Sequence, residues 1–148
     1  MQMMFIILTQ GKLIETAELD HLDQVAALIA ACCHDYNHDG FNNAYHVNAI
    51  TTRSVRYNDV SVQEGYHAAE SFQLLLEPKN NFLSDLRSED LKTFKRRMMG
   101  VILATDMAKH TEDLEIFKRK LQSNGIKRES KNGNLFLDRT NGKTLFES

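Results

Sequence analysis

The 148-residue sequence has one proline, seven glycines and no tryptophan. A fold built of many short strands needs turn residues every few positions, so this shortage favours helices. Cysteine is also scarce, because Cys32 and Cys33 are the only two. They are adjacent in a stretch with helical spacing, where a disulfide between them would be strained. We therefore predict free thiols and a reducing compartment.

Two further absences exclude classes of partner. The 18 Lys and Arg residues nearly balance the 20 Asp and Glu residues. No basic stripe with interleaved aromatics is present, which argues against nucleic acid as a partner. The longest apolar run, Met3 to Leu8, is far shorter than the roughly 20 residues that a membrane span needs, and no basic segment precedes it. We predict no membrane span and a cytoplasmic location, with ciliary or membrane-tethered placement left open.

The composition that remains is that of one globular domain. Hydrophobic residues make up 42% of the chain and charged residues 26%, and a chain of this length can bury about two thirds of its unfolded surface. We find no internal repeat, glycine-rich phosphate loop, G-x-S-x-G or C-x-x-C pattern. The chemistry must therefore lie in other residues.

Apolar residues recur at three- and four-residue intervals and predict an all-α fold. The expected helices cover residues 20–33, 44–55 (weakly), 62–76, 88–110 and 111–123. We expect Asp20, Asp59 or Ser61, and Ser88 at their N-caps, Pro78 and Asn124-Gly125 as stops, and an irregular segment over 126–148. The predicted apolar faces are Leu22, Val25, Ala26, Ile29, Cys32 and Cys33; Val62, Gly65, Ala69, Phe72 and Leu76; and Leu91, Phe94, Met98, Ile102 and Thr105.

The most informative segment follows the first of these helices and reads His34-Asp35-Tyr36-Asn37-His38-Asp39-Gly40. Imidazole nitrogen suits Zn²⁺, and a carboxylate can bridge to a harder Mg²⁺ or Mn²⁺. Two such cations would hold a bridging hydroxide and neutralise a phosphoryl group during hydrolysis. Alternatively, His34 is a cation favoured by the helix C-terminus, and Asp35 and Asp39 are turn residues. This segment alone leaves both interpretations open.

Acids and imidazoles recur on two later helices. Glu64 and His67 are spaced i, i+3, so they can meet a common partner. Thr105 and Asp106 interrupt an apolar run that continues at Met107 and should be buried. A buried aspartate must be paired or hydrogen-bonded, so we expect a polar group to face Asp106. The alternative is an exposed carboxylate or a salt bridge within the helix.

Three strings in order then resemble the catalytic domain of class I 3′,5′-cyclic nucleotide phosphodiesterases. The strings are His34-Asp35-x-x-His38-x-Gly40-x-x-Asn43, Tyr57-Asn58-Asp59-x-Ser61-Val62-x-Glu64-x-x-His67 and Leu103-Ala104-Thr105-Asp106-Met107-x-x-His110. Three motifs at suitable intervals are much more specific than a single His-Asp pair. The resemblance is best over residues 19–121.

The resemblance implies an all-helical, HD-type catalytic fold with a binuclear metal pocket that hydrolyses cAMP or cGMP to the 5′-monophosphate. His34 and Asp35 match metal ligands for Zn²⁺, and Asp35 also reaches a second metal, Mg²⁺ or Mn²⁺. The other matching positions are pocket residues that support the ligands or orient metal-bound water: His38, Asn43, Glu64, His67, Thr105, Asp106 and Met107.

The sequence also departs from the pattern of the family. Asp39 stands where a proline commonly follows the second histidine, which we expect to leave the turn less rigid. The upstream H-N-x-x-H motif, which supplies the general-acid histidine, has no match, because only His21 precedes His34. A downstream aspartate ligand and the purine-binding glutamine and aromatics are also unmatched. We therefore interpret residues 1–148 as a partial catalytic domain that carries no catalytic histidine of its own.

Two other functions stay open at this point. One is a non-catalytic helical interaction protein that keeps the family scaffold, and the other is a different HD-type metal-dependent phosphohydrolase. A partial domain should also expose the apolar faces of helices. We therefore expect, besides the cyclic nucleotide, a second copy in a homo-oligomer or a partner chain that completes the domain.

Overall fold

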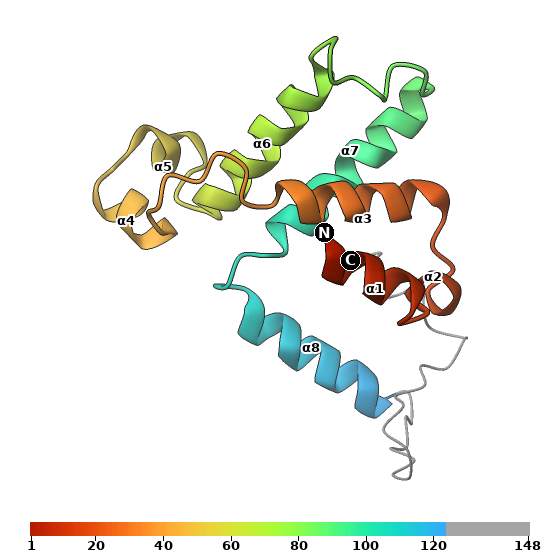
Figure 1. Cartoon of the computed structure of the whole chain (residues 1–148). Coiled ribbons are helices and arrows are strands. Elements are labelled where there is room, and N and C mark those ends of the chain that lie inside the picture. Colours follow the sequence, from red (N-terminus) through yellow and green to blue (C-terminus); the bar gives the residue numbers. More distant parts are fainter. Residues whose placement is uncertain (124–148) are drawn as a thin grey trace.

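The computed structural model describes the backbone of residues 1–123 and the side chains of residues 1–119, and in this part of the chain the regular structure is entirely helical (Figure 1). The helices are α1 (Gln2–Thr9), α2 (Leu13–Thr16), α3 (His21–Cys33), α4 (Asn43–Asn48), α5 (Thr52–Arg56), α6 (Val62–Leu76), α7 (Ser88–Leu103) and α8 (His110–Ser123). The all-α prediction is confirmed. The predicted stop at Asn124-Gly125 and the segment 126–148 lie outside the described residues. Among the described helices, none has the length and apolarity that crossing a membrane requires.

The core forms where α3 and α6 pack against α7 (Figure 1). Helix α7 contributes Phe94, Met98 and Ile102, which are fully buried and lie at four-residue intervals along one face. Helix α3 presents Ala26 and Ala30 to this core, also fully buried. Alanine side chains are short, so they let two helices approach closely. The rest of the buried cluster is Ala68, Phe72, Leu75 and Leu83.

The predicted apolar faces are correct in part. The face of α7 is confirmed, except that Thr105 lies beyond the helix and is exposed. On α3, Val25 and Cys32 are exposed, and Ala30 is buried in their place. On α6, Leu76 is exposed, and the buried side includes polar side chains as well as apolar ones: Gln63, His67 and Ser71. A search for apolar spacing cannot detect a helix face that buries polar groups.

Helix α3 begins as predicted, with Asp20 at its N-cap. The Asp20 carboxylate accepts from the backbone N–H of Asp23 at 2.8 Å, and Asp23 accepts from the backbone N–H of Asp20 at 3.1 Å. Arg97 of α7 donates to both oxygens of Asp20 at 2.7 and 2.9 Å and pairs with Asp23 at 2.9 Å. The capping carboxylates therefore also attach the start of α3 to α7.

The weak helix expected over 44–55 is two short helices in the structure. The chain breaks at Ile50, whose φ of +49° lies in the left-handed region, where a β-branched side chain is strained. Thr51 then caps α5, because its hydroxyl oxygen accepts from the backbone N–H of Ser54 at 3.2 Å. The Ile50 side chain is 76% exposed, so packing does not compensate for the strain.

The start of α6 is fixed by a long-range contact instead of a helix cap. Ser61 occupies the N-cap position, which agrees with one of the two predicted caps, Asp59 or Ser61. Its backbone is left-handed, and its side chain does not cap the helix. The Ser61 hydroxyl donates instead to Asp106 Oδ2 at 2.7 Å, and both residues are buried. Asp106 Oδ1 accepts from the backbone N–H of Ala108 at 2.9 Å. The expected polar partner of a buried Asp106 is therefore confirmed.

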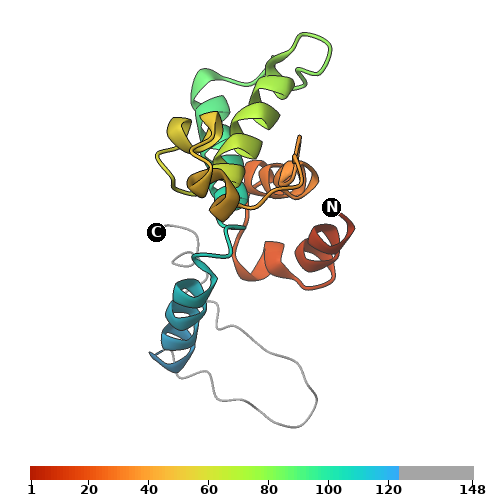
Figure 2. The same ribbon diagram turned by 90° about the vertical axis from the view of Figure 1, so that its left-hand side faces the viewer.

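The boundaries of α7 differ from the predicted ones at both ends. Arg87, and not Ser88, is the N-cap residue, and it pairs with Asp90 at 2.8 Å in place of a side-chain cap. The helix ends at Leu103 instead of His110, because the chain turns at Asp106 to reach Ser61. Helix α8 begins at His110 and lies apart from the other helices in both views (Figures 1 and 2).

We predict that Ile50→Asn raises the free energy of unfolding by roughly 1 kcal/mol, because asparagine tolerates the left-handed conformation and the isoleucine side chain is exposed. Urea denaturation measures the change. Val55 is an equally suitable β-branched control, 64% exposed but within helix α5. Val55→Asn should change the stability by less than about 0.5 kcal/mol. A less stable Ile50→Asn protein would contradict the strain at this position.

We predict that Asp106→Ala lowers the free energy of unfolding by about 2–3 kcal/mol, because it leaves the buried Ser61 hydroxyl without its acceptor. Thermal or urea denaturation is the measurement. Adding Ser61→Ala to this variant should cost much less than it does in the unmodified chain, since the two side chains form one interaction. Glu115→Ala, at an exposed acidic position of α8, is the control and should have almost no effect.

Candidate functional site

The His34-Asp35 pair lies where α3 ends. His34 is the C-cap residue, and its Nδ1–H donates to the carbonyl oxygen of Ala31 at 3.1 Å. This bond leaves Nε2 facing outward, 3.2 Å from Asp35 Oδ2. The two side chains are 45% and 66% exposed. The end of α3 therefore presents an imidazole nitrogen and a carboxylate oxygen side by side at the surface.

His67 of α6 lies beside the turn that follows this pair. Its Nδ1–H donates to the carbonyl oxygen of Tyr36 at 2.7 Å, and its ring stacks on that of His38 with 5.4 Å between the centroids. His67 is 2% exposed, and its Nε2 is buried without a hydrogen-bond partner. Because Nδ1 carries the proton, Nε2 of the neutral ring has a free lone pair.

Burial lowers the pKa of His67 below its ordinary value of 6.5. The hydrogen bond to Tyr36 acts in the opposite direction, His38 lowers the pKa further, and the charges of Asp35 and Glu64 raise it. The net shift is downward, so the neutral imidazole is the favoured form near pH 7. The contacts with Tyr36 and His38 join residues of the first motif to His67 of the second.

Asn43 connects the same two motifs at a second point. Its side-chain N–H donates to Glu64 Oε2 at 2.9 Å, and its Oδ1 accepts from the backbone N–H of Gln63 at 2.8 Å. Both contacts bind the first residue of α4 to the first turn of α6. An amide suits this position because it donates and accepts at once.

The third motif reaches the site through Asp106. The Asp106 carboxylate accepts from Ser61, the N-cap residue of α6, which stands three residues before Glu64. Asp106 therefore lies beside the start of α6. Thr105 is exposed, and its hydroxyl donates to the carbonyl oxygen of Ile102 at 2.7 Å. Met107 is 74% exposed, so the expectation that it is buried is wrong. The chain turns here, and the two neighbours of Asp106 point away from the core.

The residues present fit a metal ion in part. An exposed imidazole nitrogen and a carboxylate oxygen 3.2 Å apart are a suitable ligand pair for Zn²⁺ or a similar cation. Residues 1–119 contain no group of three or more His, Cys, Asp or Glu side chains arranged to hold a metal. His34 and Asp35 therefore offer two donor atoms, and the described residues do not complete a metal site around them.

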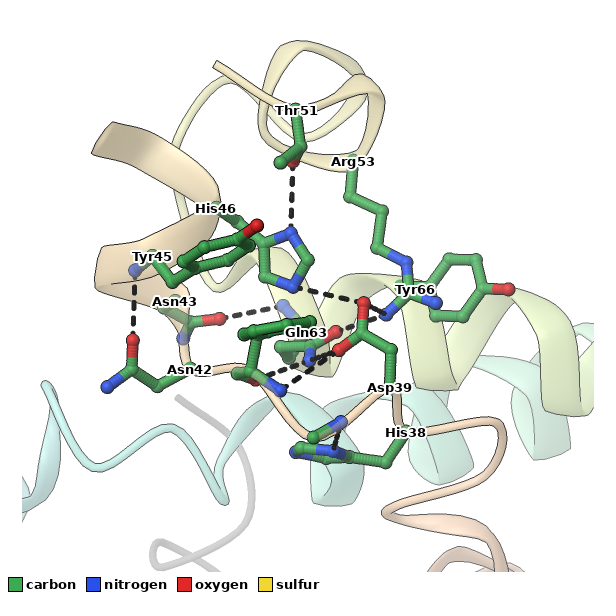
Figure 3. A network of polar contacts seen from close by, with 12 residues as sticks. His38, Asp39, Asn42, Asn43, Tyr45, His46, Thr51, Arg53, Gln63 and Tyr66 are labelled. Atoms are coloured by element: carbon green, nitrogen blue, oxygen red, sulfur yellow. Dashed lines mark hydrogen bonds and ion pairs between the residues drawn. The ribbon is translucent and has the colours of Figure 1, made fainter. Parts of the chain in front are cut away.

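A polar cluster beside the predicted site escaped the sequence analysis. It consists of Asp39, His46, Arg53 and Gln63, from the turn, α4, α5 and α6 (Figure 3). Asp39 was expected to leave its turn less rigid than a proline would, but the structure changes that interpretation, because its carboxylate has partners on all three helices. The positions of His46, Arg53 and Gln63 along the chain carry no recognisable spacing, so no pattern predicted the cluster.

Comparison with known proteins gives consistent results. The model of the family "3'5'-cyclic nucleotide phosphodiesterase" matches residues 1–141. The high affinity cGMP-specific 3′,5′-cyclic phosphodiesterase 9A of Homo sapiens is 44% identical over 101 residues, which cover 68% of this chain and 17% of that protein. The 3′,5′-cyclic-nucleotide phosphodiesterase regA of Dictyostelium discoideum is 44% identical over 105 residues, 71% of this chain and 13% of that protein.

A solved structure extends the likeness to the fold. The phosphodiesterase domain of the RhoPDE fusion protein from Salpingoeca rosetta superposes with a TM-score of 0.72 at 31% identity, over 86% of this chain and 38% of that chain. This chain thus spans well under half the length of the relatives that it matches. The match over residues 1–141, the relatives at 44% identity and the shared helical fold agree, and the chain belongs to the 3′,5′-cyclic nucleotide phosphodiesterase family.

Proposed function

We propose that this chain forms part of the active centre of a 3′,5′-cyclic nucleotide phosphodiesterase, and that the complete protein hydrolyses cyclic nucleotides to 5′-monophosphates. The observation that carries the proposal is that hydrogen bonds join the three motifs. Tyr36 accepts from His67 at 2.7 Å, Asn43 donates to Glu64 at 2.9 Å, and Ser61 donates to Asp106 at 2.7 Å. Residues 21 to 45 positions apart in sequence thereby meet at one end of α6.

Membership of the family implies dependence on metal ions. We assign His34 and Asp35 as ligands of Zn²⁺, with Asp35 shared with Mg²⁺ or Mn²⁺. When bound, the two cations supply the nucleophile and neutralise charge on the phosphoryl group. The remaining ligands and the general acid are provided by parts of the catalytic domain that the family pattern places on either side of the matched motifs.

The side chains around the ligand pair have separate roles in this proposal. His67 keeps a neutral ring and holds the turn that follows the ligand pair, through its hydrogen bond to the Tyr36 carbonyl. Glu64 is held by Asn43, so its carboxylate is fixed in direction. Such outer groups orient ligands and set the basicity of water near a metal. Asp106 is hydrogen-bonded to Ser61 at the start of α6, and this bond fixes the turn that contains Thr105 and Met107.

The substrate class follows from the relatives. One is named for cGMP, and the phosphodiesterase 8A of Homo sapiens, 40% identical over 100 residues, is named for cAMP. The two relatives differ in the base that they are named for. We therefore propose a cyclic 3′,5′-nucleotide as substrate and test both.

A chimera tests the function directly. Residues 19–121 replace the matching segment of the human phosphodiesterase 9A catalytic domain, and hydrolysis of cGMP and cAMP is measured with Zn²⁺ and Mg²⁺ present. We expect turnover, and we expect Asp35→Ala in the chimera to lower kcat/KM by more than about 100-fold, because it removes a shared ligand. Glu89→Gln, an exposed carboxylate on α7, is the matched control and should retain full activity.

One outcome would contradict this function, and a second would contradict the assignment of Asp35 as a ligand. A chimera that folds and binds both metals but hydrolyses neither nucleotide would show that these motifs no longer support catalysis, which favours the interaction protein. Full activity of the Asp35→Ala chimera would show that Asp35 is a turn residue and not a ligand. Circular dichroism and metal analysis of each purified protein separate these results from misfolding.

We predict that His67 makes the chain less stable in acid. Its pKa is lowered in the folded state, so the unfolded chain binds the proton more readily. The stability from the neutral ring is complete above the unfolded value of 6.5 and is lost as the pH falls from there through the folded pKa. The measurement is urea unfolding at about pH 8 and about pH 5.5.

His67→Gln should reduce the difference in stability between the two pH values, because glutamine does not titrate. Ser71→Ala is the control, one turn further along α6 at another buried polar position, where the hydroxyl donates to the carbonyl oxygen of Cys33 at 3.3 Å. It should lower the stability equally at both pH values. An unchanged pH dependence in His67→Gln would contradict the assignment.

A further inference from the structure

Asp39 lies between His38 and Gly40, in the turn that leads from α3 to α4, and its carboxylate is fully occupied. Oδ1 accepts from the side-chain N–H of Gln63 at 2.8 Å and from the backbone N–H of Phe41 at 3.2 Å. Oδ2 lies 3.0 Å from Arg53 Nη1 and 3.4 Å from His46 Nε2. Two hydrogen bonds, the ion pair with Arg53 and the nearby imidazole of His46 leave this carboxylate little freedom to reorient.

These donors come from elements that are separate along the chain. His46 belongs to α4, Arg53 to α5 and Gln63 to α6, and Figure 3 shows the Asp39 carboxylate where the three meet. His46 is 3% exposed and Gln63 4%. An exposed ion pair contributes little to the free energy of folding. A cluster whose partners are buried restricts the positions of its side chains more strongly.

The partners of Asp39 are themselves fixed. The Arg53 guanidinium lies 3.6 Å over the ring of Tyr66, and Arg53 Nη1 also donates to Gln63 Oε1 at 2.6 Å. His46 Nδ1 is within hydrogen-bond distance of Thr51 Oγ1, at 3.0 Å. Gln63 Nε2 donates a second time, to the carbonyl oxygen of Phe41 at 2.7 Å. The cluster therefore has one geometry, and the turn is attached to it.

The cluster around Asp39 affects the candidate site through the neighbouring residue, His38. Its Nδ1 accepts from the backbone N–H of Gly40 at 2.8 Å, so the ring proton is on Nε2. This bond depends on the shape of the turn, in which Gly40 has a φ of +89° that favours glycine. His38 and Asp39 thus each accept from the backbone N–H two residues ahead. His38 also stacks on the ring of His67, whereas Asp39 has the polar partners outside the turn.

We propose that Asp39 is a positioning residue, which holds the 38–41 turn through Arg53, His46 and Gln63 so that His38 presents its Nε2–H from a single tautomer and direction. The importance of this role for catalysis rests on the proposed function. The positioning of His38 by Asp39 does not depend on that function. Proline would restrict the same position covalently, by fixing φ. The carboxylate achieves a comparable restriction through contacts with three helices.

The electrostatics of the cluster support the geometry. Burial on its own raises the pKa of Asp39, but the hydrogen bonds from Gln63 and Phe41 and the charges of Arg53 and His46 lower it, and the net pKa is below the ordinary value of 3.8. Asp39 is therefore ionised at neutral pH and can pair with the Arg53 guanidinium.

The test is nuclear magnetic resonance of the full chain with ¹⁵N-labelled histidine, at about pH 8 so that the rings are neutral. Tautomers are distinguished by the ¹⁵N shifts of the two ring nitrogens, and a His38→Asn variant identifies the His38 signals. We expect two widely separated shifts for His38, as for one fixed tautomer. Asp39→Ala should bring them together, as for a mixture.

Three further variants separate positioning from general stability. Asp39→Pro should restore the separated shifts, because the ring restricts the turn without the carboxylate. Arg53→Met should bring the His38 shifts together in the unmodified chain but leave them unchanged in the Asp39→Pro background. Asp39→Asn, which keeps one acceptor oxygen and loses the charge, should give an intermediate separation and serves if Asp39→Ala does not fold.

His67 is the internal control, because Tyr36 fixes its tautomer independently of the cluster. Its two shifts should stay widely separated in every folded variant, because the contact with His38 is a ring stacking that does not hold the His67 proton. Unchanged His38 shifts in folded Asp39→Ala and Asp39→Asn proteins would overturn the proposal, and so would equal changes at His38 and His67, which would indicate loss of the fold as a whole. Because neither metal nor substrate enters this measurement, its outcome is independent of whether the phosphodiesterase function is correct.

Discussion

The packing of α7 against α3 and α6 is the interaction on which the rest of the structure depends. Phe94, Met98 and Ile102 are fully buried at this junction, and burying each such side chain is worth roughly 1.5–3 kcal/mol. The same packing brings the end of α3 to the middle of α6, where Ser71 donates to the carbonyl oxygen of Cys33 at 3.3 Å. His34 and Asp35 are the next two residues of the chain. The apolar core therefore decides where the candidate metal ligands lie.

Outside that core, polar contacts fix the conformation of the chain. The turn after α3 has few apolar side chains and no regular structure, yet it must place His38 next to His67. It does so through Asp39 and Asn43, whose partners lie on α4, α5 and α6. Such contacts depend on direction and distance, so they specify a geometry that apolar burial alone would leave loose.

Prediction from the sequence succeeded where a signal was local. The N-cap at Asp20 and the face of Phe94, Met98 and Ile102 both follow from neighbouring residues. It failed where a distant partner decided the outcome. Ser61 has the residue type of an N-cap, but Asp106, 45 positions away, takes its hydroxyl. The same contact ends the run that would otherwise extend α7 toward His110.

The sequence by itself determined the helical class, the family and the identity of the residues available for chemistry, because spacing and motif order are properties of the chain alone. Only the tertiary structure decided which of those residues meet. It paired Asn43 with Glu64, placed the ring of His67 against Tyr36 and His38, and left Met107 exposed. It also assembled the cluster around Asp39 from three helices. The physical reason is that a hydrogen bond or ion pair between distant segments requires the fold to bring both partners within about 3 Å, a condition that no local pattern of residues records.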